Sequence, residues 1–380
     1  MPESWNNFGQ NTAEQNLDIE LLKREVGQRF PFYDMRYNAK TVAFFCRIDK
    51  ETLEERFNDL RNSLSEKGYI PMLRFEKGEH ILYITKKPKR KEKPIWINII
   101  LLIATIITTI LTGSLLNMGV LDTWSLSDPM DVFKLENLVN GAIFFAFPLL
   151  SILIIHEMGH YFISKKHGIS TSLPFFLPIP PIIPGFNIGT FGALISSRDP
   201  MPNKKALFDV GIAGPIAGFI VAIPVMIIGI TTADIVPIPP DIPSGTVIFN
   251  ESILMTFLTS FFIDIPAGYT ITINPVYFAG WVGLLITSIN LLPAGQLDGG
   301  HIFRAVLGEK QKYASWAAIF IMILTGWWFF AFVILLMIGM MHPPPLNDDT
   351  KLDVKRQLLF FVAIFILVVC YIPWPLQVMP

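Results

Sequence analysis

Short apolar runs alternate with charged positions over the first quarter of the chain. Residues 18–27 and 49–67 carry apolar side chains at helical spacing, and residues 41–48 form a strand-like apolar run. Residues 72–75 and 81–85 flank a Lys77-Gly78-Glu79 turn, as the two strands of a hairpin do. The pattern predicts a small soluble α+β domain over residues 1–86.

The rest of the chain contains long stretches without any Asp, Glu, Lys or Arg. Each stretch can hold the roughly 20 apolar residues that a transmembrane helix needs. We predict spans at residues 95–117, 139–165, 207–231, 275–292, 314–341 and 357–373. The fifth span is long enough to tilt or to break near Gly326, and residues 253–263 read as an interfacial helix. The expected fold class is therefore a membrane all-α bundle of about six helices over residues 95–373.

A proline-rich stretch at residues 167–197 differs from these spans, although it is also uncharged. Its prolines forbid a continuous helix, and residues 186–197 combine β-forming side chains with Gly189 and Gly192, as a short hairpin would. Irregular backbone at membrane depth is tolerated only where it lines a cavity or is buried in protein. We therefore expect a re-entrant Pro-rich loop with a β-hairpin; a surface loop is the alternative.

Composition agrees with this division into two parts. The chain is 52% hydrophobic and 16% charged, with a mean hydropathy of +0.48, which places it in a membrane. A net charge of −1, and the lack of a basic patch interleaved with aromatics, exclude nucleic acid as an expected partner. Two cysteines cannot form a disulfide framework. Polar residues 1–16 resemble neither a signal peptide nor a transit peptide.

A basic linker at residues 87–94 separates the two parts and predicts the membrane orientation. Positive residues beside a span stay on the cytoplasmic side and are attracted by anionic lipid, so the N-terminal domain is expected in the cytoplasm. Lys165 and Lys166 after the second span agree with this orientation. A single fifth span would instead place charged residues 342–356 outside, so the side of the C-terminus stays open. The expected location is a prokaryotic plasma membrane, with an archaeal source as one option.

The second span ends in His156-Glu157-Met158-Gly159-His160. Two imidazoles at i and i+4 lie on one helical face with a carboxylate between them, which is a zinc-binding spacing with a candidate general base. An ionisable residue inside a membrane helix costs at least about 2.5 kcal/mol, so these side chains point to function.

A catalytic zinc needs a third protein ligand, and Asp298 is the candidate. It is the only acid between Asp264 and Glu309, and it follows Pro293, which ends the fourth span. A simple turn at Asp298-Gly299-Gly300 is the alternative. His301 is a rival ligand, but it lies beyond the turn. The remaining histidines, which have no partner at a ligand spacing, are His80, His167 and His342.

The His156-Glu157-x-x-His160 motif, followed by Asn290, Pro293, Asp298 and Gly299, resembles the site-2 protease family of intramembrane zinc metalloproteases, peptidase family M50. Residues 189–193, 208–215, 279–281 and 343–348 resemble the branch shared by archaeal, cyanobacterial and plastid members. The resemblance covers about residues 95–356, and no motif position departs from the pattern.

The resemblance implies regulated intramembrane proteolysis of transmembrane protein substrates. One Zn²⁺ per chain would be held by His156, His160 and Asp298, with Glu157 as general base and Asn290 positioning the substrate peptide or its oxyanion. The substrate-binding residues that we expect are Gly189, Thr190, Phe191, Gly192 and Pro293. The lipid bilayer and a regulatory partner of the N-terminal domain are the other expected partners.

Two other classes of protein could use the same zinc ligands. CAAX-processing zincins take a third ligand from a downstream Glu, whereas here no acidic residue other than Asp298 lies in a downstream span. A membrane zinc transporter or a non-proteolytic metal sensor would bind zinc without hydrolysis. Transport sites need further polar ligands along an exit path, and the outer halves of these helices offer almost none.

Overall fold

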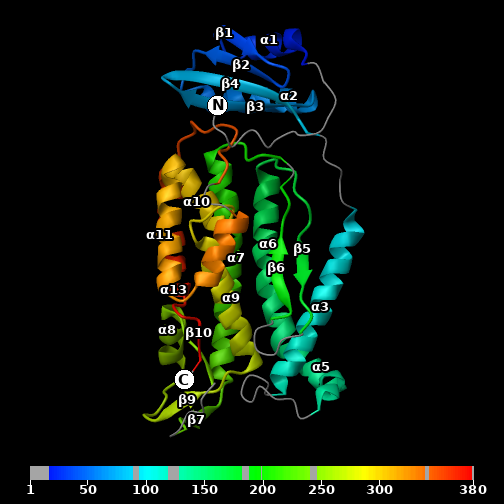
Figure 1. Cartoon of the computed structure of the whole chain (residues 1–380), viewed down its shortest axis with the longest axis vertical. Helices are drawn as coiled ribbons and strands as arrows, with labels where there is room; N and C mark the ends of the chain where they lie inside the picture. The colour runs from blue at the N-terminus through cyan, green and yellow to red at the C-terminus, as the bar shows by residue number, and fades with distance from the viewer. Residues whose placement is uncertain are drawn as a thin grey trace. The chain divides into compact units, whose positions relative to one another are not determined.

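The computed structural model describes residues 17–88, 94–118, 128–181, 188–197, 199–239, 246–338 and 342–378. Its chain divides into two compact units, which we call the α+β unit and the helical unit (Figure 1). The α+β unit consists of Met1–Lys91 together with Pro200–Lys204 and Pro344–Lys351. The helical unit consists of Glu92–Asp199, Lys205–Pro343 and Leu352–Pro380.

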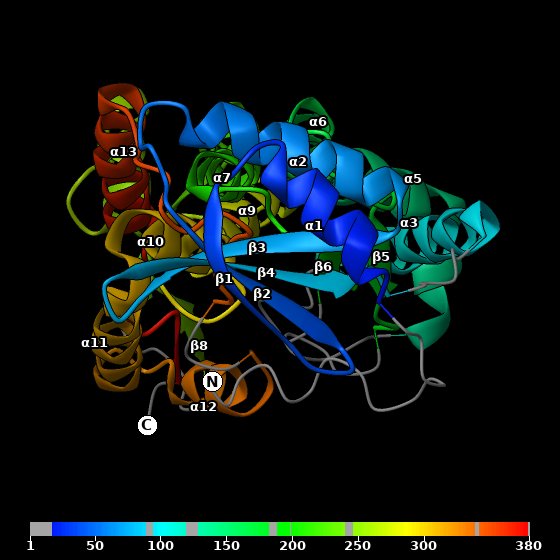
Figure 2. The ribbon, with the colours of Figure 1, turned by 90° about the horizontal axis from the view of Figure 1, so that it is seen from above.

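Two helices and a four-stranded antiparallel sheet build the α+β unit. Its elements are α1 (Ile19–Gly27), β1 (Phe32–Tyr37), β2 (Thr41–Cys46), α2 (Leu53–Glu66), β3 (Tyr69–Glu76) and β4 (Glu79–Lys86). The strand order is β1-β2-β4-β3, and α1 and α2 run next to one another across the sheet (Figure 2). Asp18 caps α1 by accepting a hydrogen bond from the Leu21 amide. Both helices and the hairpin lie where the sequence pattern predicted them, while the pattern missed β1.

One hydrophobic core joins the sheet and both helices of the α+β unit. Leu22 from α1, Phe57 from α2 and Phe44 from β2 are almost completely buried in it. Leu346, from the distant segment Pro344–Lys351, belongs to the same core. The Leu73 amide donates to the Leu346 carbonyl at 2.7 Å, so this segment adds to the β3 edge of the sheet.

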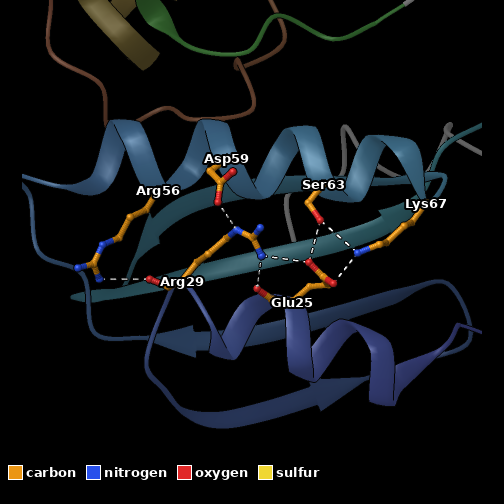
Figure 3. A network of polar contacts seen from close by, with 6 residues as sticks. All are labelled: Glu25, Arg29, Arg56, Asp59, Ser63 and Lys67. Carbon is orange, nitrogen blue, oxygen red and sulfur yellow. Dashed lines mark hydrogen bonds and ion pairs between the residues drawn. The ribbon is translucent and has the colours of Figure 1, made fainter.

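A buried carboxylate fixes α1 against α2 (Figure 3). Glu25 accepts hydrogen bonds from Lys67 at 2.5 Å, from Ser63 at 2.8 Å and from Arg29 at 3.0 Å. Arg29 also donates to Asp59 at 2.7 Å. These donors, with Lys67 first, lower the pKa of Glu25 to about 2. The network replaces the water that the carboxylate loses on burial.

Three helical runs in the described part of the helical unit are long and apolar enough to cross a membrane. They are α3 (Ile95–Asn117), the continuous run α5–η3–α6 (Leu135–Lys166) and α7 (Lys204–Thr231). Within the second run, α5 (Leu135–Gly141) passes through a π-helical turn, η3 (Ala142–Ala146), into α6 (Phe147–Lys166). That turn directly precedes Pro148, which cannot complete an ordinary helical hydrogen-bond ladder. The chain is therefore a membrane helical protein, and six spans remain a prediction.

The other helices of this unit are shorter. They are α8 (Ile253–Phe262), α9 (Pro275–Leu291), α10 (Asp298–Leu307), α11 (Gln311–Leu324), α12 (Trp328–Val333) and α13 (Val354–Cys370). The short helical turns are η2 (Pro129–Phe133), η4 (Gly308–Lys310) and η5 (Ile334–Ile338). Two small antiparallel pairs join β7 (Ile235–Pro237) to β9 (Tyr269–Ile271) and β8 (Val247–Phe249) to β10 (Leu376–Val378).

A single helix over residues 314–341 does not form. Helix α11 ends at Leu324, Gly326 adopts a left-handed φ of +82°, and α12 starts only at Trp328. The turn is held by the chain after α13: the Trp374 amide donates to Thr325 O at 2.7 Å, and Trp327 Nε1 donates to Ile372 O at 2.8 Å. The break near Gly326, one of the two options left open by the sequence, is confirmed.

The proline-rich stretch contains an antiparallel strand pair, β5 (Phe175–Pro178) with β6 (Thr190–Leu194). The described residues 188–197 thus supply one strand of this pair and do not form the hairpin of their own that the sequence predicted. Residues 182–187 lie outside the described part of the chain. Strand β5 contacts α3 along its length. Asn98 of α3 donates to the Leu173 and Pro174 carbonyls at 2.8 and 3.0 Å, and Thr108 donates to Gly189 O at 2.6 Å. Polar side chains near the start and in the middle of this apolar helix thus satisfy the irregular backbone, as membrane depth requires.

Candidate metal site

His156 and His160 lie one turn apart on α6 and face the interior of the helical unit. Their side chains are 4% and 9% exposed, and the ring centroids are 4.9 Å apart. The two Nε2 atoms lie 3.2 Å from each other. The i, i+4 spacing therefore produces the convergence of ring nitrogens that the sequence predicted.

Asp298, the first residue of α10, completes the cluster. Its Oδ2 lies 3.3 Å from His156 Nε2 and 3.2 Å from His160 Nε2. A tight turn after Pro293 brings it there: a Cβ at Gly299 would approach the carbonyls of Leu291 and Leu292 to less than 3.0 Å, so only glycine fits. Asp298 is thus placed opposite α6 rather than serving only as a turn residue.

The three donor atoms have the spacing that zinc requires. Ligand bonds of about 2.0–2.1 Å in a tetrahedral arrangement put neighbouring donors about 3.3 Å apart, and the three separations in the cluster are 3.2, 3.2 and 3.3 Å. Among the described residues, His156, His160 and Asp298 are the one group of His, Cys, Asp or Glu that meets this ligand geometry. Two imidazoles and one carboxylate leave a fourth tetrahedral position open for water or substrate.

Helix α7 forms the surface on which the two imidazoles lie. The His160 Nδ1–H donates to the Val210 carbonyl at 2.7 Å, which leaves Nε2 free for a metal and fixes the ring orientation. A Cβ at Gly214 would lie less than 3.0 Å from three ring atoms of His160, and a Cβ at Gly218 would lie 3.1 Å from His156 Nδ1. Sequence reasoning missed these roles, although the Gly214-x-x-x-Gly218 spacing is a signal for close helix packing.

The two candidate catalytic residues lie beside the cluster. Glu157 is 7% exposed and follows the first ligand on α6. Asn290 is on the last turn of α9, and its Nδ2 is 3.4 Å from His156 Nε2. The structure therefore places a carboxylate beside a ligand on α6 and the side-chain amide of a residue on α9 within 3.4 Å of that same ligand.

The predicted substrate-binding residues are not all at the cluster. Gly189 precedes β6, and Thr190, Phe191 and Gly192 are in β6, with the Phe191 side chain 81% exposed. Strand β6 contacts α6, the ligand helix. Pro293 is buried in the turn before Asp298, and its carbonyl accepts a hydrogen bond from Ser315. Its position indicates that it shapes the turn that carries Asp298.

The other histidines have partners of their own. His301 is bonded through Nδ1 to the Leu297 carbonyl, and its ring lies 4.2 Å from that of His342. His80 contacts Asp349 within the α+β unit, and His167 contacts Asp209. None of these rings belongs to the three-donor group, so the choice of Asp298 over His301 agrees with the geometry.

Comparison with known proteins gives a consistent result. The sequence profile described as "Peptidase family M50" matches residues 144–334, which include both motifs. "Probable zinc metalloprotease EGY1, chloroplastic" of Oryza sativa subsp. japonica is 32% identical over 188 residues, 48% of this chain and 31% of the relative. "Probable zinc metalloprotease EGY2, chloroplastic" of Arabidopsis thaliana is 32% identical over 190 residues, 48% of this chain and 32% of the relative. The chain thus spans about a third of the length of these relatives. No solved structure matches it significantly.

Proposed function

The chain belongs to peptidase family M50, and we propose that it is a zinc metalloprotease that hydrolyses peptide bonds within or near the transmembrane segments of membrane proteins. The spacing of 3.2–3.3 Å among three donors, the buried His156 and His160 and the partly buried Asp298, carries this proposal. The names of the relatives, which are zinc metalloproteases, support the choice of metal.

Glu157 is the general base of the proposed reaction. Zinc, when bound, would acidify a water molecule and polarise the scissile carbonyl. Glu157 is in the sequence position next to one ligand and on the same helix as both, so its carboxylate can take the proton from that water and deliver it to the leaving amine. Its burial removes competing solvent from the proton transfer.

Asn290 is a candidate donor to the developing oxyanion. Its amide nitrogen lies 3.4 Å from His156 Nε2, so it is close to the position that we assign to the metal. A neutral amide placed there stabilises negative charge without competing for the metal as a carboxylate would. We assign it this role together with positioning of the substrate peptide.

Strand β6 is the element that we assign to substrate binding. A helical substrate hides its carbonyls, so it must be unwound, and an extended peptide can be held by pairing with a strand edge. Strand β6 pairs with β5 on one side, and in the described part of the chain no other strand pairs with it. Its exposed Phe191 and Leu194 side chains can contact an apolar substrate.

The wider biological setting follows from the same reasoning. A protease of membrane segments must be selective, and we assign selectivity to the α+β unit, either through substrate gating or through a regulatory partner. The basic linker favours a cytoplasmic α+β unit and a prokaryotic plasma membrane as its location. The relatives named above carry the designation chloroplastic.

A paired measurement tests the function. Zinc content and cleavage of a single-span model substrate are measured for the purified chain in detergent and for Glu157→Gln. We expect about one zinc in both proteins and cleavage by the native chain alone. A transporter would be supported instead if both proteins bound zinc, neither cleaved any of a panel of single-span substrates, and the native chain took up zinc into proteoliposomes.

A second pair of variants tests the role of β6. Phe191→Pro removes a backbone donor from the strand, whereas Phe191→Ala removes only the exposed ring. We expect Phe191→Pro to abolish cleavage with zinc content unchanged and Phe191→Ala to retain cleavage. Gly189→Pro is a poorer test, because Gly189 has a φ of +80° that proline cannot adopt. Full activity of Phe191→Pro would exclude β6 as the substrate-binding strand.

A further inference from the structure

A polar cluster joins the ends of three helices of the helical unit. Asp209 on α7 accepts a hydrogen bond from His167 Nε2 at 2.9 Å, and His167 is the C-cap residue of α6. Arg356 on α13 donates to the same carboxylate through Nε at 2.7 Å and Nη2 at 2.5 Å. Arg356 is held in turn by Asp353, the N-cap residue of α13. Asp209 therefore connects α6, α7 and α13 through charged and polar groups.

Asp209 directly precedes the residue that orients a metal ligand. The carbonyl of Val210 accepts the Nδ1–H of His160 at 2.7 Å. Partners of this kind fix the tautomer and the ring orientation of a metal-binding histidine. The position of the Val210 carbonyl relative to α6 therefore decides where His160 Nε2 points.

Contacts between α6 and α7 show that the two helices run antiparallel, because His160 is beside Val210 and Gly214 whereas His156 is beside Gly218. Small residues line this interface, including Gly159 against Ala213, so the backbones of the two helices lie close together there. A slip of one residue moves a helix by about 1.5 Å along its axis, which is enough to break a hydrogen bond of ordinary length.

His167 follows His160 by seven residues, close to two helical turns, so both side chains leave α6 on nearly the same face. The His160–Val210 and His167–Asp209 bonds thus link the same two helices at neighbouring points of α7. Two linked points fix the axial register of the helices, whereas one point and a stripe of small residues do not. The bidentate Arg356–Asp209 pair adds directional strength at the second point.

We propose that Asp209 is a positioning residue for the metal site, because it holds α6 and α7 in the register that lets Val210 orient His160. The proposal rests on the metal site assigned above. Asp209 touches neither the metal position nor the substrate position, so it acts through His167 and through the backbone of α7.

Metal affinity and metal geometry give the test. The full chain is purified in detergent and stripped of metal, and zinc affinity is measured by competition with a chromophoric chelator; Co²⁺ is added separately to record its absorption spectrum. Asp209→Asn and His167→Ala are each expected to lower zinc affinity about 10-fold and to alter the cobalt bands. His167→Gln can still donate to Asp209, so it should retain most of the native affinity and the native spectrum.

A double variant and a matched control separate positioning from general damage. Because the two residues act through one contact, Asp209→Asn combined with His167→Ala should lose no more affinity than the weaker-binding single variant. Glu25→Gln is the matched control, because Glu25 also accepts hydrogen bonds from three donors but belongs to the α+β unit. This variant should leave zinc affinity unchanged. If Asp209→Asn is not recovered folded, the His167→Ala and His167→Gln pair makes the same comparison.

The outcomes distinguish this proposal from the proposed function. Native zinc affinity and a native cobalt spectrum in Asp209→Asn and His167→Ala would overturn the positioning role, as would an equal loss in Glu25→Gln. A native chain that binds zinc no better than His160→Ala would instead overturn the metal site itself. The positioning role is established if Asp209→Asn and His167→Ala lose zinc affinity while His167→Gln and Glu25→Gln retain it.

Discussion

Gly214 faces His160 so closely that a Cβ at position 214 would come within 3.0 Å of three atoms of the imidazole ring. Such a contact forces the ring or the helix to move. Gly214→Ala should therefore weaken zinc binding by 10-fold or more, and cleavage should fall with it. Gly218→Ala, whose Cβ would lie 3.1 Å from His156 Nδ1, should have a smaller effect. Zinc titration of both variants measures the two affinities. Equal affinities would contradict the expectation that Gly214→Ala binds zinc more weakly than Gly218→Ala.

Asp298 and His301 lie one helical turn apart on α10, but only Asp298 is in the donor cluster. Asp298→Ala should reduce bound zinc well below one per chain, because two imidazoles alone leave a weak site. His301→Gln should retain about one zinc, since the His301 Nδ1 is bonded to the Leu297 carbonyl instead. Metal analysis after dialysis measures both. Loss of zinc from His301→Gln alone would reassign the third ligand.

Glu25 makes the stability of the α+β unit depend on pH. Its folded pKa is about 2, below the ordinary value of 4.5, so its stabilising contribution is complete above pH 4.5 and is lost as the pH falls toward 2. Glu25→Gln should destabilise α1 and α2 by about 1–3 kcal/mol at pH 7. Hydrogen exchange in the full chain should show this difference shrinking between pH 5 and pH 2.5. A difference independent of pH would refute the assignment.

Leu346 should stabilise the α+β unit as a core residue would. It is 5% exposed and packs among residues of both helices and the sheet. Leu346→Ala should cost about 2–4 kcal/mol of unfolding free energy in this unit. Buried Cys46, whose pKa burial raises to about 12, reports opening when its thiol becomes reactive to an alkylating reagent in urea.

The alkylation experiment is best done in a Cys370→Ser background, so that Cys46 is the one thiol. Val354→Ala, at a position 69% exposed, is the matched control and should not shift the urea dependence. If Leu346→Ala and Val354→Ala behave alike, the segment containing Leu346 is not part of the folded core.

Local sequence patterns predicted most of the helices and strands. The periodicity of residues 18–27 and 49–67 located α1 and α2, because each buries one apolar face. The uncharged stretches located α3 and α7 to within a few residues. Strand β1 was missed because its side chains are half-buried or exposed, so the strand has no apolar run.

Contacts between segments distant in sequence could not be predicted in this way. The i, i+4 spacing of His156 and His160 is local, and the glycines after Pro293 suggested a turn for Asp298. The role of the Val210 carbonyl depends on the register of α7 against α6, which no single helix encodes. The contribution of Leu346 to the α+β core depends likewise on a contact with β3, at Leu73, which is distant from Leu346 in the sequence.

That shared core also limits how many times the chain can pass through a bilayer between the segments that form it. One packed core cannot be divided by lipid, so residues 17–88 and the segment of Leu346 must be on the same side of a bilayer that the chain crosses. The number of crossings between these two segments is then even. The three runs that are long and apolar enough to cross, α3, α5–η3–α6 and α7, are odd in number, so an even number would require a further crossing from the shorter helices. The turn at Gly326, which separates α11 from α12, is a point where the chain can change direction. With an even number of crossings, Lys351 would lie on the same side as Lys87, and the conflict that a single span at residues 314–341 would create would not arise.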